Sequence, residues 1–293
     1  YKIMQQLTHN KNQCKTTLYT VGSFDWKDGV KDGDVVFNPN PEGRFKVAWI
    51  PSAVDGTEHL KNRVKAVNGK FYPMNEDLGI IGCDPFSLAS THGTGSKGAI
   101  HGLTYKHQLS GAPSNKFFFE YLERPSDTEF FEDVIKVCRF YGVYLLAECN
   151  RPDLLRHLRN RGYRGFSMDR LDVPKSKLNE HERKYGGQLM ASQGILDSHM
   201  NMLGSWIEDN VGESTKEEVR PLGDIGDFAF NETLDDWLGF DPGKRTKFDA
   251  TISTGLCIMA ANKDRYRSVK PSAKSRNITN FVQVYRNQYA THQ

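Results

Sequence analysis

Two short apolar segments, each closing at or beside an acidic residue, constrain the fold of this chain most strongly. Residues 78–84 read LGIIGCD and residues 143–149 read VYLLAEC, so Asp84 ends the first segment and Glu148 lies near the end of the second. Apolar runs of this length are typical of strands buried on both faces. We therefore expect a core built around a sheet that contains both segments.

A helix is predicted between these two strands. Residues 126–141 carry apolar side chains at helical spacing, Ser126 and Glu129 match a capping box, and Gly142 is suited to end the helix. Further strands are predicted at residues 99–107, 116–122 and 163–168, and further helices at residues 153–160, 192–210, 233–238 and 248–262. This order predicts an α/β fold, with a mixed central sheet and helices on both faces.

The regions on either side of this pattern are expected to be separate. Residues 1–77 predict a β-rich N-terminal extension or linker, in which residues 35–37 and 45–50 form a hairpin around a turn at residues 38–43. Residues 78–264 form the main domain, and residues 169–187 within it are expected to be a surface loop. Residues 265–293 form a basic tail, which either neutralises phosphates or is a solvated terminus.

Composition excludes several classes of protein. The net charge of +3 does not by itself require a nucleic-acid partner. The five cysteines are scattered and include no CxxC pair, which disfavours a disulfide framework or a zinc site and fits a reducing cytosol. No apolar run approaches the roughly 18 residues that a membrane helix needs. The chain also lacks the HExxH motif of zinc hydrolases and the GxSxG motif of serine hydrolases.

Three acids occur where catalytic metals are often bound. Asp84 and Glu148 close predicted strands, and Asp249 opens the last apolar helix. If the strands are neighbours and the helix packs on them, the three carboxylates meet at one edge of the sheet. Carboxylates that meet repel one another unless a hard cation neutralises them. Two Mg²⁺ or Mn²⁺ ions held in this way support phosphodiester hydrolysis.

Each acid also has a structural explanation. Asp84 precedes Pro85 and would serve as a turn residue. Glu148 would form an ion pair with Arg151. Asp249 would cap its helix or interact with the helix dipole.

Segments of this chain resemble the C-terminal nuclease domain of bacteriophage large terminase subunits, which belongs to the ribonuclease-H-like superfamily. GIIGCDPF resembles the first strand of that domain, whose terminal Asp begins the metal site. VYLLAECN resembles the second acidic strand, with Glu148 as a ligand. GKRTKFDATISTGLCIMAA resembles the closing motif, in which an Asp starts an alanine-rich helix. The resemblance covers roughly residues 78–262.

The resemblance implies an activity and its partners. It implies a ribonuclease-H-like endonuclease that cuts double-stranded viral DNA during genome packaging in the cytoplasm of the infected bacterial host. Asp84 would bridge two Mg²⁺ or Mn²⁺ ions, and Glu148 and Asp249 would each complete one. An upstream packaging ATPase, the portal and the small terminase subunit would be its partners, and no membrane would be involved.

The third motif departs from the family pattern. Many members have His-Asp-Asp there, whereas this chain has Lys247-Phe248-Asp249. Other acids would then complete the second metal site, and Asp224, Asp227 and Asp197 are the candidates.

Basic and polar residues near the acids are candidates for contacts with DNA phosphates: His92, Lys97, Asn150, Arg151 and Lys247. The loop that carries His92 and Lys97 would otherwise be a polar hairpin tip. Two other functions stay open. One is a recombinase or junction resolvase of the same fold, and the other is a non-catalytic DNA-binding packaging module.

Overall fold

The computed structural model describes residues 1–12, 18–86, 96–106, 110–150 and 152–262. Tyr1–Ala261 form one compact unit, which includes the described part of residues 1–77. The basic tail expected at residues 265–293 lies outside the described residues. Within the described part, no helix has the length and apolar character needed to cross a membrane.

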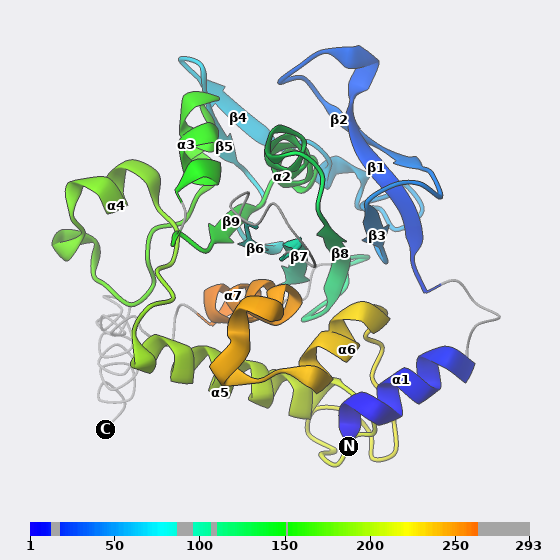
Figure 1. Ribbon diagram of the computed structural model, residues 1–293. Helices are drawn as coiled ribbons and strands as arrows, with labels where there is room; N and C mark the ends of the chain where they lie inside the picture. Colours follow the sequence, from blue (N-terminus) through cyan, green and yellow to red (C-terminus); the bar gives the residue numbers. More distant parts are fainter. Residues whose placement is uncertain (13–17, 87–95, 107–109, 151, 263–293) are drawn as a thin grey trace, which may run out of the picture. The chain divides into compact units, whose positions relative to one another are not determined.

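Helices and strands alternate irregularly along the chain (Figure 1). The α-helices are α1 (Lys2–Asn12), α2 (Asp127–Tyr141), α3 (Asp153–Asn160), α4 (Glu180–Tyr185), α5 (Gln193–Asn210), α6 (Asn231–Gly239) and α7 (Asp249–Ala261). The strands are β1 (Thr20–Trp26), β2 (Val35–Pro39), β3 (Phe45–Val47), β4 (Val64–Val67), β5 (Lys70–Pro73), β6 (Gly79–Asp84), β7 (Gly98–Thr104), β8 (Phe117–Glu123) and β9 (Tyr144–Ala147).

The central sheet has seven strands in the order β2-β1-β3-β8-β7-β6-β9, and β4 and β5 pair separately. β6, β7 and β8 form an antiparallel meander, and β9 returns after α2 to pair in parallel with β6. A single parallel bridge between Leu145 and Ser167 places the following segment beside β9. The ribonuclease-H-like arrangement consists of three antiparallel strands, followed by a helix and by a strand that is parallel to the first. The predicted fold class is confirmed.

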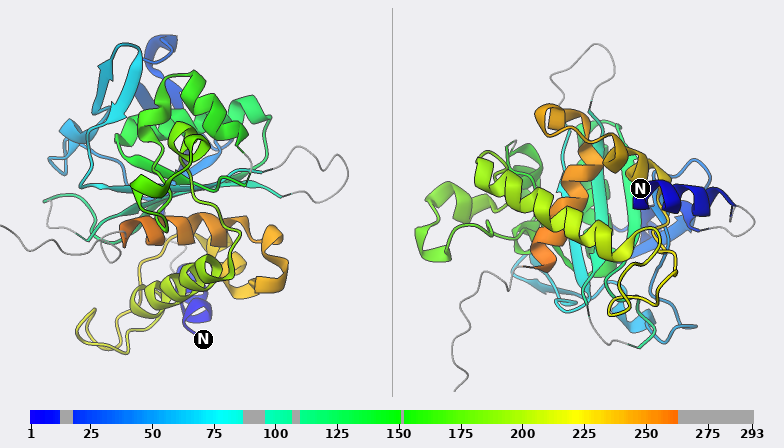
Figure 2. Two further views of the ribbon diagram at one scale, coloured as in Figure 1. Left: turned by 90° about the vertical axis from the view of Figure 1, so that its left-hand side faces the viewer. Right: turned by 90° about the horizontal axis from the view of Figure 1, so that it is seen from below.

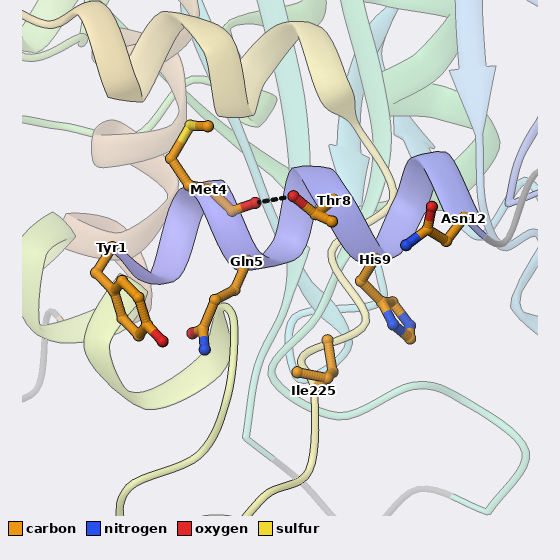
Figure 3. A pocket seen from close by; sticks show the side chains of 7 residues that line it. All are labelled: Tyr1, Met4, Gln5, Thr8, His9, Asn12 and Ile225. Carbon is orange, nitrogen blue, oxygen red and sulfur yellow. Dashed lines mark hydrogen bonds between the residues drawn. The ribbon is translucent and has the colours of Figure 1, made fainter.

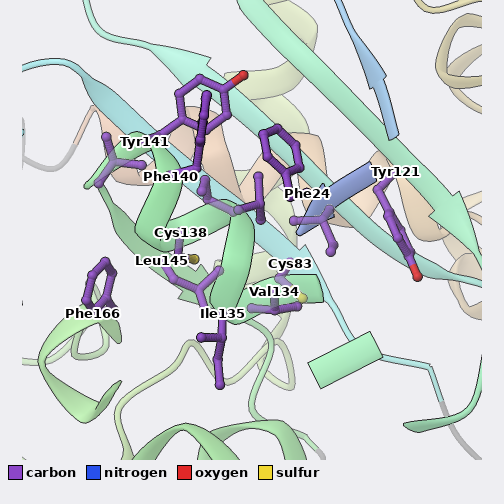
Figure 4. Close-up of a cluster of buried hydrophobic side chains, with 14 of the residues drawn as sticks. Phe24, Cys83, Tyr121, Val134, Ile135, Cys138, Phe140, Tyr141, Leu145 and Phe166 are labelled. Carbon is purple, nitrogen blue, oxygen red and sulfur yellow. The ribbon is translucent and has the colours of Figure 1, made fainter. Parts of the chain in front are cut away.

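The helix α2 covers one face of the sheet. Its predicted start and end are confirmed: Ser126 and Glu129 form the capping box, and Gly142 ends the helix with a positive φ of 63°. Its apolar side chains join those of the strands in one buried cluster, with many aromatic rings in contact (Figure 4). Because the capping signals and the apolar face agree, the sequence alone sufficed to place this helix.

The helix α7 covers the opposite face, with α5 packed on its far side (Figure 2, left). Its residues 249–260 are all buried. Trp237 of α6 donates a hydrogen bond of 3.0 Å from Nε1 to Thr254 Oγ1, and His199 of α5 lies against Gly255. Burial of almost every residue explains why α7 carries no charged side chain after Asp249.

Gly82 of β6 permits the close approach of α7. A Cβ atom at this position would lie 2.1 Å from the backbone oxygen of Ser253. We expect Gly82→Ala to destabilise the protein by about 3 kcal/mol, at the upper end of the range for overpacking, because backbone cannot move aside as a flexible side chain can. Urea unfolding measures the change.

Gly204 provides the control for this prediction. It is exposed on α5, and nothing lies within 4 Å of the Cβ that an alanine would add there. Gly204→Ala should stabilise the protein by about 0.5–1 kcal/mol, the helix-propensity difference. Equal unfolding midpoints for the two alanine variants would contradict the assigned packing of α7 on β6.

Three predictions about secondary structure are wrong. β2 and β3 do not pair with each other, because β1 lies between them and pairs with both. The strand expected at residues 163–168 is a 3-10 helix at Tyr163–Phe166. The loop expected at residues 169–187 contains α4, which a capping box of Asn179 and Glu182 begins. Which strands pair with each other is not visible in the local periodicity of the sequence. A helix of one or two turns is also too short to show a periodic pattern.

Candidate active site

Asp84 and Glu148 lie side by side at the ends of neighbouring parallel strands. Cys83 of β6 pairs with Ala147 of β9, and the Glu148 N–H donates a hydrogen bond of 2.9 Å to the Cys83 carbonyl. Paired residues on parallel strands point to the same face, and side chains two residues apart do so as well. Gly82 faces α7, so Asp84 and Glu148 are both on the α7 face of the sheet.

Asp249 lies at this same end of the sheet. Ala250, the next residue of α7, packs with Ala99 of β7 in a small buried cluster. Ala99 pairs with Asp84 across the β6–β7 ladder. The first turn of α7 therefore lies over the end of β6 that carries Asp84. Three acids that are far apart along the chain come from two strands and one helix to the same region.

The carboxylate of Asp249 accepts hydrogen bonds on both oxygens. Ser96 Oγ donates to Oδ1 over 2.5 Å, and the Lys97 N–H donates to Oδ2 over 2.7 Å. Burial raises the pKa of Asp249, these two bonds lower it, and the charge of Glu148 raises it, with a net increase. Ionised Asp249 is therefore costly beside Glu148, and a cation between them would offset that cost.

The donor chemistry fits a hard divalent cation, because the site offers carboxylate oxygens. The side chains as they stand do not form a ready ligand cluster. Glu148 accepts a hydrogen bond from Asn150 Nδ2, and Asp249 is bound by Ser96 and Lys97. Across the described parts of the chain, no group of three or more His, Cys, Asp or Glu side chains is close enough together to hold a metal ion. Binding of a metal would require the three carboxylates to come closer together than they lie in this structure.

The additional acids expected at the second metal lie elsewhere. Asp227 forms an ion pair with Lys116, the residue before β8, and Lys116 O accepts from Thr104 N at the last residue of β7. This is the end of the sheet where β6 begins, about 17 Å from Asp84 at 3.3 Å per strand residue. The loop that carries Asp224 and Asp227 packs on α1 instead. In the structure Asp224 and Asp227 therefore lie away from the end of the sheet that carries Asp84.

Asp197 was the third candidate for the second metal. It lies exposed on α5, where its carboxylate accepts a hydrogen bond of 2.7 Å from Gln193 Nε2. This is an ordinary contact between neighbouring turns of a surface helix.

The acid that the structure brings near Asp249 is Asp236 of α6. Its Oδ1 accepts hydrogen bonds from the backbone N–H of Thr251, over 2.9 Å, and from the Thr251 hydroxyl. Burial raises the pKa of Asp236 to about 6, with the charge of Asp249 contributing and the bonds from Thr251 opposing. The sequence contained no signal for this, because Asp235 and Asp236 look alike until α6 is docked against α7.

The candidate DNA contacts divide into three cases. Lys97 is exposed beside Asp249, and its ammonium lies 3.7 Å from Glu232. Lys247 is also exposed, at the end of the 3-10 helix that precedes α7. Asn150 binds Glu148. His92 and Arg151 lie outside the described residues. The predicted ion pair between Glu148 and Arg151 therefore also falls outside them.

A shallow pocket on α1 is unrelated to this site. Tyr1, Met4, Gln5, Thr8, His9, Asn12 and Ile225 line it (Figure 3). None of them belongs to β6, β9 or α7.

Comparisons with known proteins show a likeness in fold alone. No protein-family model matches the chain, and no curated protein sequence matches it. Among solved structures, the large terminase nuclease from the thermophilic phage G20c, crystallised with bound zinc, is similar in fold. The superposition covers 88% of this chain and 97% of that one, with a TM-score of 0.42 and 10% sequence identity.

Proposed function

We propose that this protein is a metal-dependent endonuclease that cleaves double-stranded DNA, with the role of a large terminase nuclease domain in viral genome packaging. The observation that carries the proposal is the placement of Asp84, Glu148 and Asp249 at one end of a ribonuclease-H-like sheet, on the face that α7 covers. A structural explanation for each acid taken singly does not account for all three lying together.

The chain's own residues have distinct parts in the proposed activity. Asp84, Glu148 and Asp249 would hold two Mg²⁺ or Mn²⁺ ions, which when bound supply an activated water and stabilise the leaving oxygen. Ser96 and the Lys97 N–H hold the Asp249 carboxylate in a fixed orientation. The exposed ammonium groups of Lys97 and Lys247 flank the acids and would bind the phosphates of the scissile strand.

The biological setting is part of the same proposal. Double-stranded DNA is the substrate, and an upstream packaging ATPase, the portal and the small terminase subunit are the partners. The reaction takes place in the cytoplasm of an infected bacterial host. The motifs GIIGCDPF, VYLLAECN and GKRTKFDATISTGLCIMAA support this setting.

A non-catalytic DNA-binding module is the second candidate, and a specific observation favours it. The described side chains do not present a closed group of metal ligands. In that case DNA binding would persist in EDTA and no strand would be cut. A recombinase or junction resolvase would use the same acids, and it would be recognised by joined strands or a preference for branched substrates.

The test is incubation of supercoiled plasmid with the full chain in Mg²⁺, Mn²⁺, Ca²⁺ or EDTA. We expect nicked and linear DNA with Mg²⁺ or Mn²⁺ and intact plasmid with EDTA. Ca²⁺ should support little cleavage, because it takes more ligands in a looser geometry than Mg²⁺. If the plasmid stays intact under every condition and the protein still shifts DNA in a gel, the nuclease proposal is rejected in favour of the non-catalytic binding module.

A further inference from the structure

The start of α7 is held by a side chain from another helix. The first N–H groups of a helix have no partner within the helix and need one from outside. Asp236 of α6 provides it, since its Oδ1 accepts from the N–H of Thr251 over 2.9 Å. The hydroxyl of Thr251 donates to the same oxygen. Asp236 thus acts on α7 as an N-cap residue would, from a different element.

The helix that carries Asp236 is itself tied to the sheet. In the first turn of α6, the backbone N–H and the hydroxyl of Thr233 both donate to Glu120 Oε2, over 3.1 Å and 2.5 Å. Glu120 lies on β8 and is 1% exposed. Asp236 therefore lies on a helix that is hydrogen-bonded to the sheet. Its bond to Thr251 connects the first turn of α7 to the sheet through α6.

Asp249 belongs to that first turn, two residues before Thr251. Any movement of the turn changes where the Asp249 carboxylate lies relative to β6 and β9. The charge of Asp249 also contributes to the raised pKa of Asp236, as expected for two carboxylates that lie near each other.

We propose that Asp236 is a positioning residue that holds the first turn of α7 so that Asp249 is presented to Asp84 and Glu148. The inference rests on the proposed function, in which these three acids bind divalent metal. It adds a fourth acidic residue to the site, which acts through the backbone and hydroxyl of Thr251.

The test measures Mn²⁺ affinity by isothermal titration calorimetry on the full chain, well below each variant's unfolding temperature. Asp236→Ala should weaken Mn²⁺ binding by about 10- to 100-fold, as loss of a group that orients a metal ligand typically does. Asp236→Asn should recover most of that affinity, because the amide oxygen can accept the same two hydrogen bonds.

Trp237→Phe is the matched control. It removes a different hydrogen bond between α6 and α7, from Trp237 Nε1 to Thr254 Oγ1, one turn further along α7 from Asp249. It should lower the unfolding temperature and leave the Mn²⁺ affinity unchanged. A general loosening of the helix pair would instead weaken Mn²⁺ binding in both variants.

The outcomes separate this inference from the function on which it rests. Suppose that the wild type binds Mn²⁺, that Asp84→Ala abolishes this binding, and that Asp236→Ala binds Mn²⁺ as tightly as the wild type. The positioning role is then overturned and the metal site stands. Equal losses of affinity in Asp236→Ala and Trp237→Phe also overturn the positioning role. If the wild type binds no Mn²⁺, both proposals fall.

Discussion

Asp84→Ala should abolish Mn²⁺-dependent plasmid cleavage, with a loss of rate on the order of 10³-fold or more, as removal of a central catalytic group commonly causes. Asp84 ends β6 beside Glu148 and is 8% exposed. In the proposed site Asp84 would be a ligand of the metal ions, so its loss would remove a ligand that no neighbouring side chain replaces. The rate of nicking of supercoiled plasmid measures the effect, and the circular dichroism spectrum should remain that of the wild type.

Asp227→Ala is the matched control for this experiment. It removes an acid that was also a candidate ligand on sequence grounds, but that forms an ion pair with Lys116 at the opposite end of the sheet. Cleavage by this variant should equal that of the wild type. A clean preparation of Asp84→Ala that still cuts DNA, or an inactive Asp227→Ala, would refute the assigned site.

Glu120→Ala should lower the free energy of unfolding by about 3–5 kcal/mol, the usual cost of removing one partner from a buried ion pair. Glu120 binds Lys46 Nζ over 2.9 Å and caps α6 through Thr233. Beside it is His101, whose pKa burial lowers. The ammonium of Lys46 supplies a positive charge that balances Glu120. Urea unfolding at pH 7 measures the change.

Glu232→Ala is the control, because Glu232 binds the same Lys46 ammonium but its side chain is 51% exposed. The loss there should be below about 1 kcal/mol, as for other exposed ion pairs. Similar losses in the two variants would show that burial of Glu120 does not determine its contribution.

The pH dependence of this contribution has a definite sign. Burial raises the pKa of Glu120, but the nearby His101, the charge of Lys46 and the bond from Thr233 lower it to about 2. A carboxyl whose pKa is lower in the folded state stabilises the fold above its unfolded value. The difference between wild type and Glu120→Ala should therefore be full above about pH 5 and shrink as the pH falls toward 2.

Local patterns in the sequence were enough to predict the elements that carry the site. The strands β6 and β9 are continuous apolar runs, and α2 has both a capping box and a terminal glycine. These signals depend on residues only a few positions apart, so they survive without knowledge of the fold. The acids Asp84, Glu148 and Asp249 follow from them, because each stands at the boundary of such an element.

Only the tertiary structure decided how these elements and acids are combined. β1 separates β2 from β3, Asp227 lies at the far end of the sheet, and Asp236 reaches Thr251 from another helix. Each of these depends on contacts between residues far apart in the chain, for which spacing along the sequence contains no information. Local chemistry thus determined which residues could act, whereas packing of α6 and α7 against the sheet determined which of them lie together.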